Sequence, residues 1–448
     1  MSAESLPSQS CDQAEVSEET KAGNYFVSNY PPFHFWDPGT ARHLPELLDV
    51  PSAIETPLGL YFHIPFCRKR CHFCYFRVYT DKNAGEIQRY LDAGIRELER
   101  YARAPFVNGR LPQFVYFGGG TPSYLSVPQL RSLTDRMKAL LPWTAAQEVT
   151  FEAEPGTLNE AKLHAIRELG VTRLSLGVEN FDSHILEING RAHKADEIQR
   201  AYKAARAAGF PQINVDLISG MVEETDENWR ENIRKLVDMA PDCVTIYQME
   251  VPYNTGIYKQ MKVDGKLVAP VADWATKRRW VDYAFQEFEK KGYTVTSTTT
   301  VVRDPAKVKF EYRHGLFSGA DLLSIGVASF GHLNGVHYQN QHEFQPYLDA
   351  IQAGRLPTFR AYVLPRDEQY LREFMLQLKL GQVSASAFES KFGVDPRKQF
   401  AGPLSTLSEW GFMAGGGDTI ALTRDGLLQV DRLLQEFFKP EHRTGRYA

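Results

Sequence analysis

One short loop carries three of the chain's five cysteines, Cys67, Cys71 and Cys74, in the spacing C-x3-C-x2-C. The apolar run at residues 58–64 precedes it and is typical of a buried β-strand, which Pro65 ends. Three thiolates at a strand end can bind one side of a compact metal centre, but a structural zinc site needs a fourth ligand. A 4Fe–4S cluster held by three cysteines keeps one iron open for chemistry. The spacing therefore favours a cluster, with a zinc knuckle or a redox dithiol as alternatives.

No further cysteine follows in this loop, where Phe76 stands at a position that a fourth thiol would fit. Cys11 lies in a polar stretch and Cys243 in an apolar run. Such a distribution does not make a disulfide framework and suits a reducing compartment. Residues 1–21 lack the apolar segment of a signal peptide, and no run reaches the length of a transmembrane helix. We therefore expect a cytoplasmic protein without an integral membrane segment.

Beyond the cysteine loop, short apolar runs alternate with longer amphipathic segments. This alternation predicts βαβ units and a parallel sheet, and the apolar strands indicate that helices cover it. About six units indicate an α/β fold with a partial (β/α)6 barrel, in which functional residues lie at the C-terminal strand ends. Strands are expected at residues 58–64, 113–117, 148–153, 173–178, 212–217 and 242–248. Helices are expected at residues 84–101, 127–141, 159–169, 195–208, 227–238 and 272–290.

The length of 448 residues is enough for one large domain and a smaller one. We expect residues 1–50 to form a disordered tail and a packing arm rich in aromatic residues and proline. Residues 51–340 are expected to form the barrel, and residues 341–448 a small, mostly helical domain that ends in a helix at 424–438. That last helix is acidic, with Asp425, Asp431 and Glu436, and the net charge is −4. Neither feature suits nucleic-acid binding, and we expect a monomer.

Polar or glycine-rich motifs follow successive predicted strands. Strand two runs into the glycine turn Gly118–Pro122, strand three ends at Glu152, and strand four ends at Glu179. Arg191 lies shortly after strand four, and Asp216 ends strand five. Consecutive glycines let the backbone approach a ligand and direct N–H groups at an anion, although a tight strand-to-helix turn is the alternative. Together with the cysteine loop after strand one, motifs follow five successive strands in order, and this predicts a ligand site at the strand ends.

The cysteine loop, with Phe73 before its last cysteine, resembles the signature of radical S-adenosylmethionine (SAM) enzymes. The preceding Tyr61-Phe62-His63-Ile64-Pro65-Phe66 resembles the branch typified by oxygen-independent coproporphyrinogen III oxidase, which includes haem chaperones and radical methyltransferases. The resemblance implies the partial barrel, a winged-helix-like C-terminal domain, a 4Fe–4S cluster, and one SAM molecule or two. One electron from a donor such as flavodoxin or ferredoxin would cleave SAM to a 5'-deoxyadenosyl radical.

The resemblance also implies which residues bind these groups. Cys67, Cys71 and Cys74 would hold the cluster, and Tyr61 would lie against the sulfonium of SAM. Glu179 stands where the family more often has glutamine. The other residues implied to bind SAM are Phe73, Gly119, Gly120, Thr121, Glu152, Arg191 and Asp216. No catalytic residue is implied.

Three reactions are consistent with this family. Decarboxylases of the family carry a fourth cysteine two residues after the third, where this chain has Phe76. We therefore expect methyl or methylene transfer from a second SAM to a tetrapyrrole, quinone or other aromatic substrate. The alternatives are oxidative decarboxylation of coproporphyrinogen III and a haem chaperone. Chaperones carry an HNxxYW-like element, which residues 337–341 do not reproduce.

Overall fold

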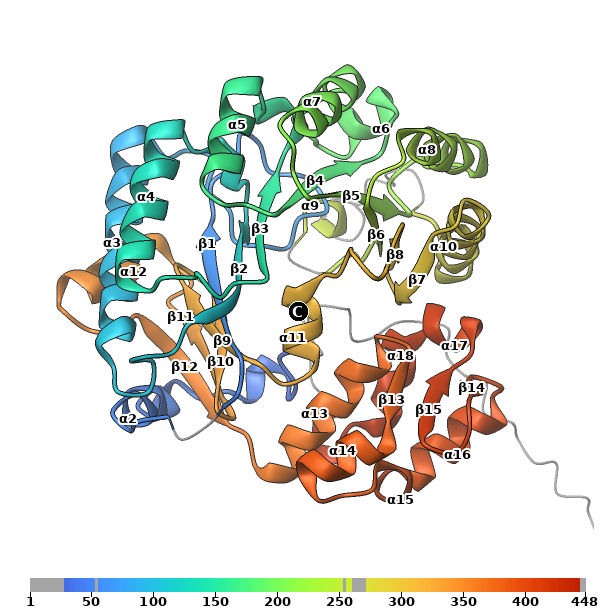
Figure 1. Ribbon diagram of the computed structural model, residues 1–448. Coiled ribbons are helices and arrows are strands. Elements are labelled where there is room, and N and C mark those ends of the chain that lie inside the picture. Colours follow the sequence, from blue (N-terminus) through green and yellow to red (C-terminus); the bar gives the residue numbers. More distant parts are fainter. Residues whose placement is uncertain (1–27, 53–54, 253–254, 260–270, 444–448) are drawn as a thin grey trace, which may run out of the picture.

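A twelve-stranded sheet forms the centre of the computed structural model, which describes residues 28–52, 55–252, 255–259 and 271–443. The strand order is β12-β11-β10-β9-β1-β2-β3-β4-β5-β6-β8-β7, and the strands from β9 through β1 to β6 run parallel. The sheet curves into an open barrel (Figure 1). Its parallel strands are β1 (Leu58–Ile64), β2 (Pro112–Gly119), β3 (Glu148–Ala153), β4 (Arg173–Glu179), β5 (Gln212–Ser219), β6 (Cys243–Gln248) and β9 (Asp321–Ile325).

Helices lie outside the curved sheet, as the alternating sequence pattern predicts (Figure 1). Sequence signals fix several helix starts: Asn83 and Glu86 form a capping box at α3, and Ser126 and Gln129 form one at α4. All six expected helices are present, with ends shifted by a few residues at most. The helices of this layer are α3 (Ala84–Arg103), α4 (Val127–Leu140), α5 (Glu160–Glu168), α6 (Ser183–Ile188), α7 (Ala195–Ala207), α8 (Asp226–Met239), α10 (Trp274–Glu289) and α12 (Phe344–Gln352).

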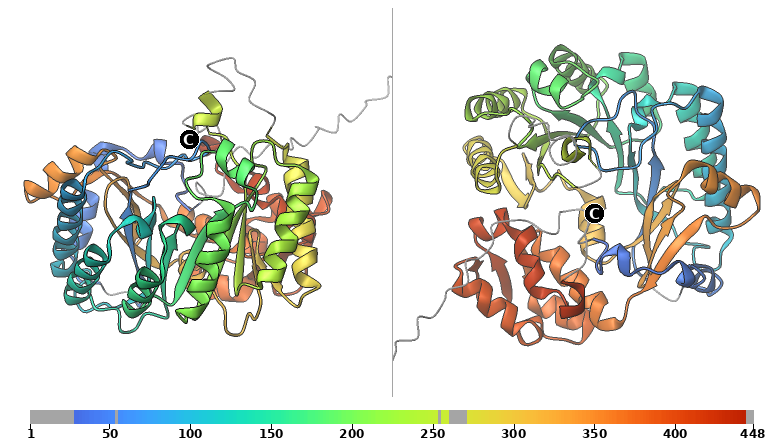
Figure 2. Two further views of the ribbon diagram at one scale, coloured as in Figure 1. Left: turned by 90° about the horizontal axis from the view of Figure 1, so that it is seen from above. Right: turned by 180° about the vertical axis from the view of Figure 1, so that it is seen from behind.

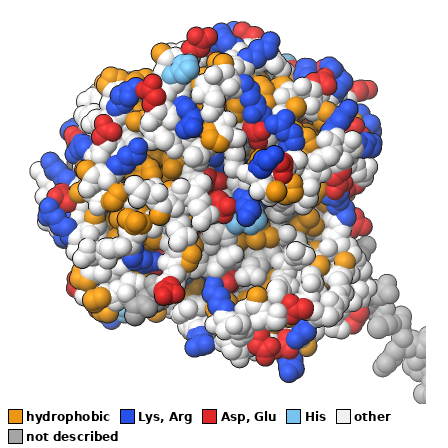
Figure 3. All heavy atoms as spheres, viewed as in Figure 1, with side chains coloured by type: hydrophobic (Ala, Val, Ile, Leu, Met, Phe, Trp, Pro, Cys, Tyr) orange, Lys and Arg blue, Asp and Glu red, His pale blue; other side chains and the backbone are white. Residues whose placement is uncertain are grey.

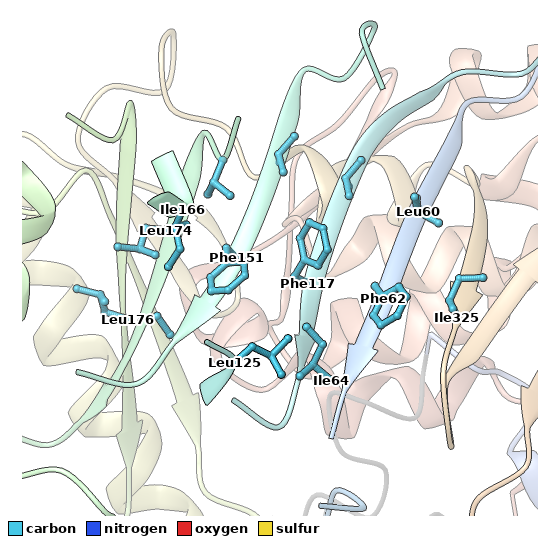
Figure 4. Packing of buried hydrophobic residues seen from close by; sticks show 14 of the residues in the cluster. Leu60, Phe62, Ile64, Phe117, Leu125, Phe151, Ile166, Leu174, Leu176 and Ile325 are labelled. Atoms are coloured by element: carbon cyan, nitrogen blue, oxygen red, sulfur yellow. The ribbon is translucent and has the colours of Figure 1, made fainter. Parts of the chain in front are cut away.

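The core fills the space between the parallel strands and these helices (Figure 4). Phe62 on β1, Phe117 on β2 and Phe151 on β3 are all buried, and the rings of Phe117 and Phe151 lie 5.8 Å apart between centroids. Leu174 and Leu176 on β4 extend the same layer. Burial of such apolar side chains is the main favourable term in folding, and it holds the strand ends at one edge of the sheet.

Antiparallel strands extend the sheet at both edges. The hairpin of β7 (Thr294–Ser297) and β8 (Thr300–Val302) pairs with β6. At the other edge, β10 (Phe330–Leu333), β11 (Val336–Asn340) and β12 (Thr358–Val363) follow β9. The expected domain boundary at residue 341 therefore falls inside this sheet, because β12 pairs along β11.

The C-terminal unit is a separate small sheet with helices around it, beside β7 and α10 (Figures 1 and 2). The expected closing helix at residues 424–438 is wrong as one element, because Gln429 leaves the helical conformation with φ −115°. The sheet has the order β13-β15-β14, with β13 (Gln382–Ser384), β14 (Met413–Ala414) and β15 (Thr419–Leu422). The helices are α13 (Arg366–Leu378), α14 (Ala385–Phe392), α15 (Pro396–Gln399), α16 (Ala401–Glu409), α17 (Arg424–Leu428) and α18 (Val430–Leu433), followed by the 3-10 turns η6 (Leu434–Phe437) and η7 (Pro440–His442).

The N-terminal arm packs across the far edge of the main sheet. Trp36 is buried, its ring stacks on His337 of β11 at 4.9 Å between centroids, and Asp37 bridges to Ala361 of β12. Tyr30 hydrogen-bonds through its hydroxyl to His442 of the C-terminal unit at 2.8 Å. The described part of the arm thus connects the sheet edge to the C-terminal unit, while residues 1–27, which include the expected disordered tail, lie outside the described residues. The arm contains η1 (Phe33–Phe35), η2 (Pro38–Thr40) and α2 (His43–Leu48).

No helix in the described ranges has the length and apolar character needed to cross a membrane.

A buried carboxylate, Glu97 of α3, joins the helix layer to the sheet. Its Oε1 accepts a hydrogen bond from Asn340 Nδ2 at 2.6 Å, and its Oε2 accepts from Gly326 N at 3.0 Å and Tyr347 Oη at 2.6 Å. Burial raises the pKa of Glu97 to about 8 although three donors face it. These contacts connect α3 with the end of β9, with β11 and with α12.

Replacing Glu97 by alanine should lower the melting temperature, because three buried donors lose their acceptor. We expect the free energy of unfolding to fall by about 3 kcal/mol. Glu99→Ala on the same helix is the matched control, since Glu99 is partly exposed and pairs only with Arg103. Calorimetry of both variants checks this, and equal melting temperatures would contradict a supporting role for Glu97.

Candidate functional site

The three cysteines lie in the wall of a cavity of about 460 Å³ at the C-terminal strand ends. This size is in the range of small-molecule sites. Of the residues expected to form a site, one does not line the cavity: Tyr61, whose ring stacks on that of Tyr116 at 5.9 Å, and Tyr116 does line it. Those that line it are Cys67, Cys71, Phe73, Cys74, Gly119, Gly120, Thr121, Glu152, Glu179, Arg191 and Asp216.

The cysteine loop is held by backbone contacts and by two donors to sulfur. Thr121 Oγ1 donates to Cys67 Sγ at 3.3 Å, and Arg191 Nη1 donates to Cys71 Sγ at 3.3 Å. Burial raises the pKa of Cys67 to about 11 and that of Cys74 to about 12. Within the described residues, no three His, Cys, Asp or Glu side chains converge in an arrangement that suits one metal ion. The shared lining of one cavity by three thiols suits a polynuclear group, whose ligands bind different metal atoms.

The backbone of the glycine turn is hydrogen-bonded to the end of β1 and to the start of the cysteine loop. Gly120 N donates to Ile64 O at 2.8 Å, and Thr121 N donates to Phe66 O at 2.8 Å. A Cβ on Gly120 would lie 2.8 Å from Ile64 O, and Gly119 has φ +111°. The expectation that these N–H groups are directed at a ligand is therefore wrong for Gly120 and Thr121, because both are already bonded.

Three carboxylates form an acidic wall of the cavity: Glu179 is buried, and Glu152 and Asp216 are half-buried. Glu152 accepts from Tyr116 Oη at 2.6 Å and from Gly119 N at 3.1 Å. Burial raises the pKa of Glu152 and of Glu179 to about 7 each, and Asp216 also has a raised pKa for the same reason. Negative charge on one member disfavours charge on the others, so this wall is suited to a cationic ligand.

Glu179 has an unusual backbone for its residue type, with φ 66° at the end of β4. A non-glycine residue in this region is strained, and such strain often occurs at ligand sites. Arg191 lies close, with its Nη2 3.5 Å from Glu179 Oε1 and 2.6 Å from Gly177 O. The Nε of Arg191 is buried without a hydrogen-bond partner, so one donor of this guanidinium is available for an anionic group.

A second, basic wall was not predicted from the sequence. It includes Arg313 of α11 (Glu311–Phe317) and Lys379, beside the hydroxyl-rich turn at residues 297–299 between β7 and β8. Lys379 Nζ pairs with Asp431 of the C-terminal unit at 2.6 Å. Arg313 lies in no motif, and only its place among aromatic residues, Phe310 and Tyr312, distinguishes it in the sequence.

Charges of both signs are mixed over the face seen in Figure 1, without a field of one sign (Figure 3). The acidic wall and the basic wall are therefore features of the cavity lining and do not continue as charged patches over this face.

The comparisons with known proteins agree with this geometry. The family model described as the radical SAM superfamily matches residues 61–236. An oxygen-independent coproporphyrinogen III oxidase of Synechocystis is 27% identical over 406 residues, which cover 86% of this chain and 85% of that protein. A haem chaperone of Bacillus subtilis is 28% identical over 383 residues, which cover 84% of this chain and 98% of that protein. The solved coproporphyrinogen III oxidase of Escherichia coli superposes with a TM-score of 0.79 at 22% identity, covering 94% and 99%, which supports the fold.

Enzymes of this superfamily use a 4Fe–4S cluster and SAM, and the donor set of the cavity fits both. Three thiols share one wall, and the acidic wall lies beside a guanidinium with a free donor. The expected cofactors are therefore confirmed at the level of the superfamily. The chain is thus a radical SAM enzyme whose superfamily domain spans residues 61–236, and over most of its length it is similar to oxygen-independent coproporphyrinogen III oxidases and to a haem chaperone.

Proposed function

We propose that the chain catalyses the oxygen-independent oxidative decarboxylation of a porphyrinogen that carries propionate groups, such as coproporphyrinogen III. The observation that carries this proposal is one cavity with three thiols in its wall and a buried arginine, Arg313, in another part of it. Such a cavity can hold a cationic cofactor and an anionic substrate together. Similarity to oxidases over 86% of the chain adds support.

Within this proposal, Cys67, Cys71 and Cys74 hold the cluster. Arg191 offers its Nε to the carboxylate of SAM, and the carboxylates of Glu152, Glu179 and Asp216 face its positive groups. When bound, the cluster and SAM supply radical hydrogen abstraction. The ring of Tyr61 stacks on that of Tyr116 and so supports a residue of the cavity wall. Phe73 packs beside an apolar cluster that contains Ile218 and Met249.

The reaction balances for each propionate group. The side chain loses one hydrogen atom from the carbon next to the ring, then carbon dioxide and one electron, and a vinyl group remains. The hydrogen atom would go to the 5'-deoxyadenosyl radical and give 5'-deoxyadenosine. One electron enters from a donor such as flavodoxin or ferredoxin to start the cycle, and the electron released with carbon dioxide passes to a one-electron acceptor such as the oxidised form of the same carrier. A cytoplasmic location and a monomeric state remain predictions.

Methyl or methylene transfer, our first expectation from the sequence, receives no support from the comparisons. The chain-wide relatives described above are oxidases and a haem chaperone. Phe76, on which that expectation depended, lines the cavity next to the cysteine loop, where its ring lies 4.7 Å from that of Tyr75. A second SAM molecule also remains a prediction.

A haem chaperone is the second candidate. Phe76 favours it, because the position two residues after the third cysteine carries no thiol, and the similarity to a chaperone extends over 98% of that relative. A chaperone would bind haem stoichiometrically and turn over little SAM.

Reduced holoenzyme incubated anaerobically with coproporphyrinogen III and methyl-labelled SAM should release carbon dioxide and form vinyl products without label. Mass spectrometry and trapped carbon dioxide measure both. Labelled product would instead indicate methyl transfer. Tight haem binding without carbon dioxide would establish the chaperone.

Replacing Cys67, Cys71 or Cys74 by alanine should remove nearly all cluster iron and abolish SAM cleavage. Cys243→Ala is the matched control, because Cys243 is buried 3.8 Å from Arg173 Nη2 and outside the cavity wall. Iron and sulfide analysis after anaerobic reconstitution checks this. Stoichiometric zinc without iron in the wild type would refute the cluster.

SAM should bind more tightly as pH rises from 6 to 8. Glu152 and Glu179 have pKa values of about 7, so they are largely protonated at pH 6 and ionised at pH 8, and a cationic ligand favours the ionised form. We expect about a tenfold gain in affinity over this range. Equilibrium dialysis of unreduced holoenzyme measures it.

Glu179→Gln should show a smaller pH dependence of SAM affinity than the wild type, because one titrating group is removed. Glu187→Gln on nearby α6 is the control, since Glu187 does not line the cavity. Identical pH profiles for wild type and Glu179→Gln would show that Glu179 does not face the positive groups of SAM.

A further inference from the structure

Arg313 is a buried arginine with two unused donors in the cavity wall. Its residue is 8% exposed, and its Nη1 donates to Ser297 Oγ at 2.7 Å and to Thr300 Oγ1 at 2.5 Å. Its Nε and Nη2 are buried and have no hydrogen-bond partner among the described residues. Buried polar groups are normally paired, so two unpaired donors on one cavity-lining side chain indicate a missing partner.

The charges around Arg313 do not supply that partner. In the described ranges, no carboxylate lies within 4.0 Å of its guanidinium, since Glu148 is bonded to Thr150 and Asp216 to Ser175 and Asn214. A second guanidinium, that of Arg173, lies near the same place.

The two arginines share one aromatic ring. Arg173 Cζ lies 3.9 Å from the centroid of Phe310, and Arg313 Cζ lies 5.3 Å from it. Burial lowers the pKa of Arg313 to about 10, so it remains charged at neutral pH. The carboxylate of Glu148 lies near both guanidinium groups, but in the described ranges it is not bonded to Arg313, whose unpaired edge an anion would complete.

The positions of the unused donors indicate the kind of anion. Nε and Nη2 lie on one edge of the planar guanidinium, and this edge donates two parallel hydrogen bonds to a carboxylate. The third nitrogen is fixed by Ser297 and Thr300, so the guanidinium plane is held with its Nε–Nη2 edge buried and unpaired. Through Ser297 and Thr300, Arg313 is anchored to the β7–β8 hairpin, while its own helix, α11, packs against β2 and β3.

We propose that Nε and Nη2 of Arg313 bind one carboxylate of the substrate and thereby position the ring system in the cavity. This inference rests on the proposed function and assigns it a specificity-determining residue. Ser297, Thr298 and Thr299, which line the same part of the cavity, surround the bound group.

The test measures dissociation constants of anaerobically prepared holoenzyme for coproporphyrin III and for its tetramethyl ester, by porphyrin fluorescence. The variants are Arg313→Gln and Arg313→Lys. Arg303→Gln is the control, because Arg303 follows β8 but pairs with Asp242 outside the cavity.

Arg313→Gln should weaken binding of the acid by about tenfold or more and leave ester binding nearly unchanged. The dissociation constant of Arg313→Lys for the acid should lie between those of the wild type and Arg313→Gln, because lysine keeps the charge but not the bidentate contact. Arg303→Gln should match the wild type. If Arg313→Gln binds the acid as the wild type does, the subsite is refuted while the proposed function stands.

Equal losses for acid and ester would assign Arg313 a structural role, which also refutes the subsite. Arg313→Lys keeps the test valid if Arg313→Gln fails to fold, since weaker binding of the acid alone supports the inference and unchanged binding opposes it. A wild type that binds neither porphyrin nor haem would overturn the proposed function together with this inference.

Discussion

Backbone pairing between the cysteine loop and the glycine turn determines where the chemistry of this protein can take place. The ladder between β1 and β2 continues beyond both strands, through Gly120 N to Ile64 O and Thr121 N to Phe66 O. Only a residue without Cβ allows this approach, since a methyl group on Gly120 would lie within 3 Å of three backbone atoms of the loop. The same turn brings the hydroxyl of Thr121 to Cys67 Sγ. Loop and turn therefore act as one rigid unit at the strand ends.

The charges in the cavity follow from the same geometry. Parallel strands bring their carboxyl ends to one edge, so Glu152, Glu179 and Asp216 gather although they lie far apart in the sequence. Their mutual repulsion and burial keep the wall short of full charge until a cation binds. Arg191 links this wall to the thiols, because it contacts Cys71 Sγ and lies 3.5 Å from Glu179. One guanidinium therefore contacts both the cysteine loop and the acidic wall.

The sequence was informative where local pattern decides structure. Alternating apolar runs and amphipathic segments predicted the six parallel strands and the main helices, and motifs at strand ends predicted the thiols and the acidic wall of the cavity. Elements fixed by tertiary contacts were missed. The seven-residue α11 has no periodic signal, and it is held by contacts with β2, β3 and α13. Strands β9 and β10 also lie outside the six strands expected for the barrel, and they are separate elements because Gly326 and Ala328 adopt positive φ values and turn the chain between them. The glycine turn was expected to direct N–H groups at a ligand, but Gly120 and Thr121 bind the backbone next to the cysteine loop. Consecutive glycines in a sequence indicate a close approach, but not which group approaches.

Closure of the barrel explains why the basic wall could not be predicted. The parallel strands leave an opening beside β8, and α11 lies there with the C-terminal unit next to it (Figure 1). Thr298 joins these parts, because its N donates to Lys379 O and its Oγ1 to Leu427 O. Arg313 and Lys379 reach the cavity only through this assembly of segments from three regions of the chain. The cysteine loop and acidic wall belong to the repeating part of the fold, whereas the basic wall belongs to the part that closes it. In this chain, the barrel strands thus position the thiols and the acidic wall, and the segments that close the barrel position Arg313, the proposed contact for a substrate carboxylate.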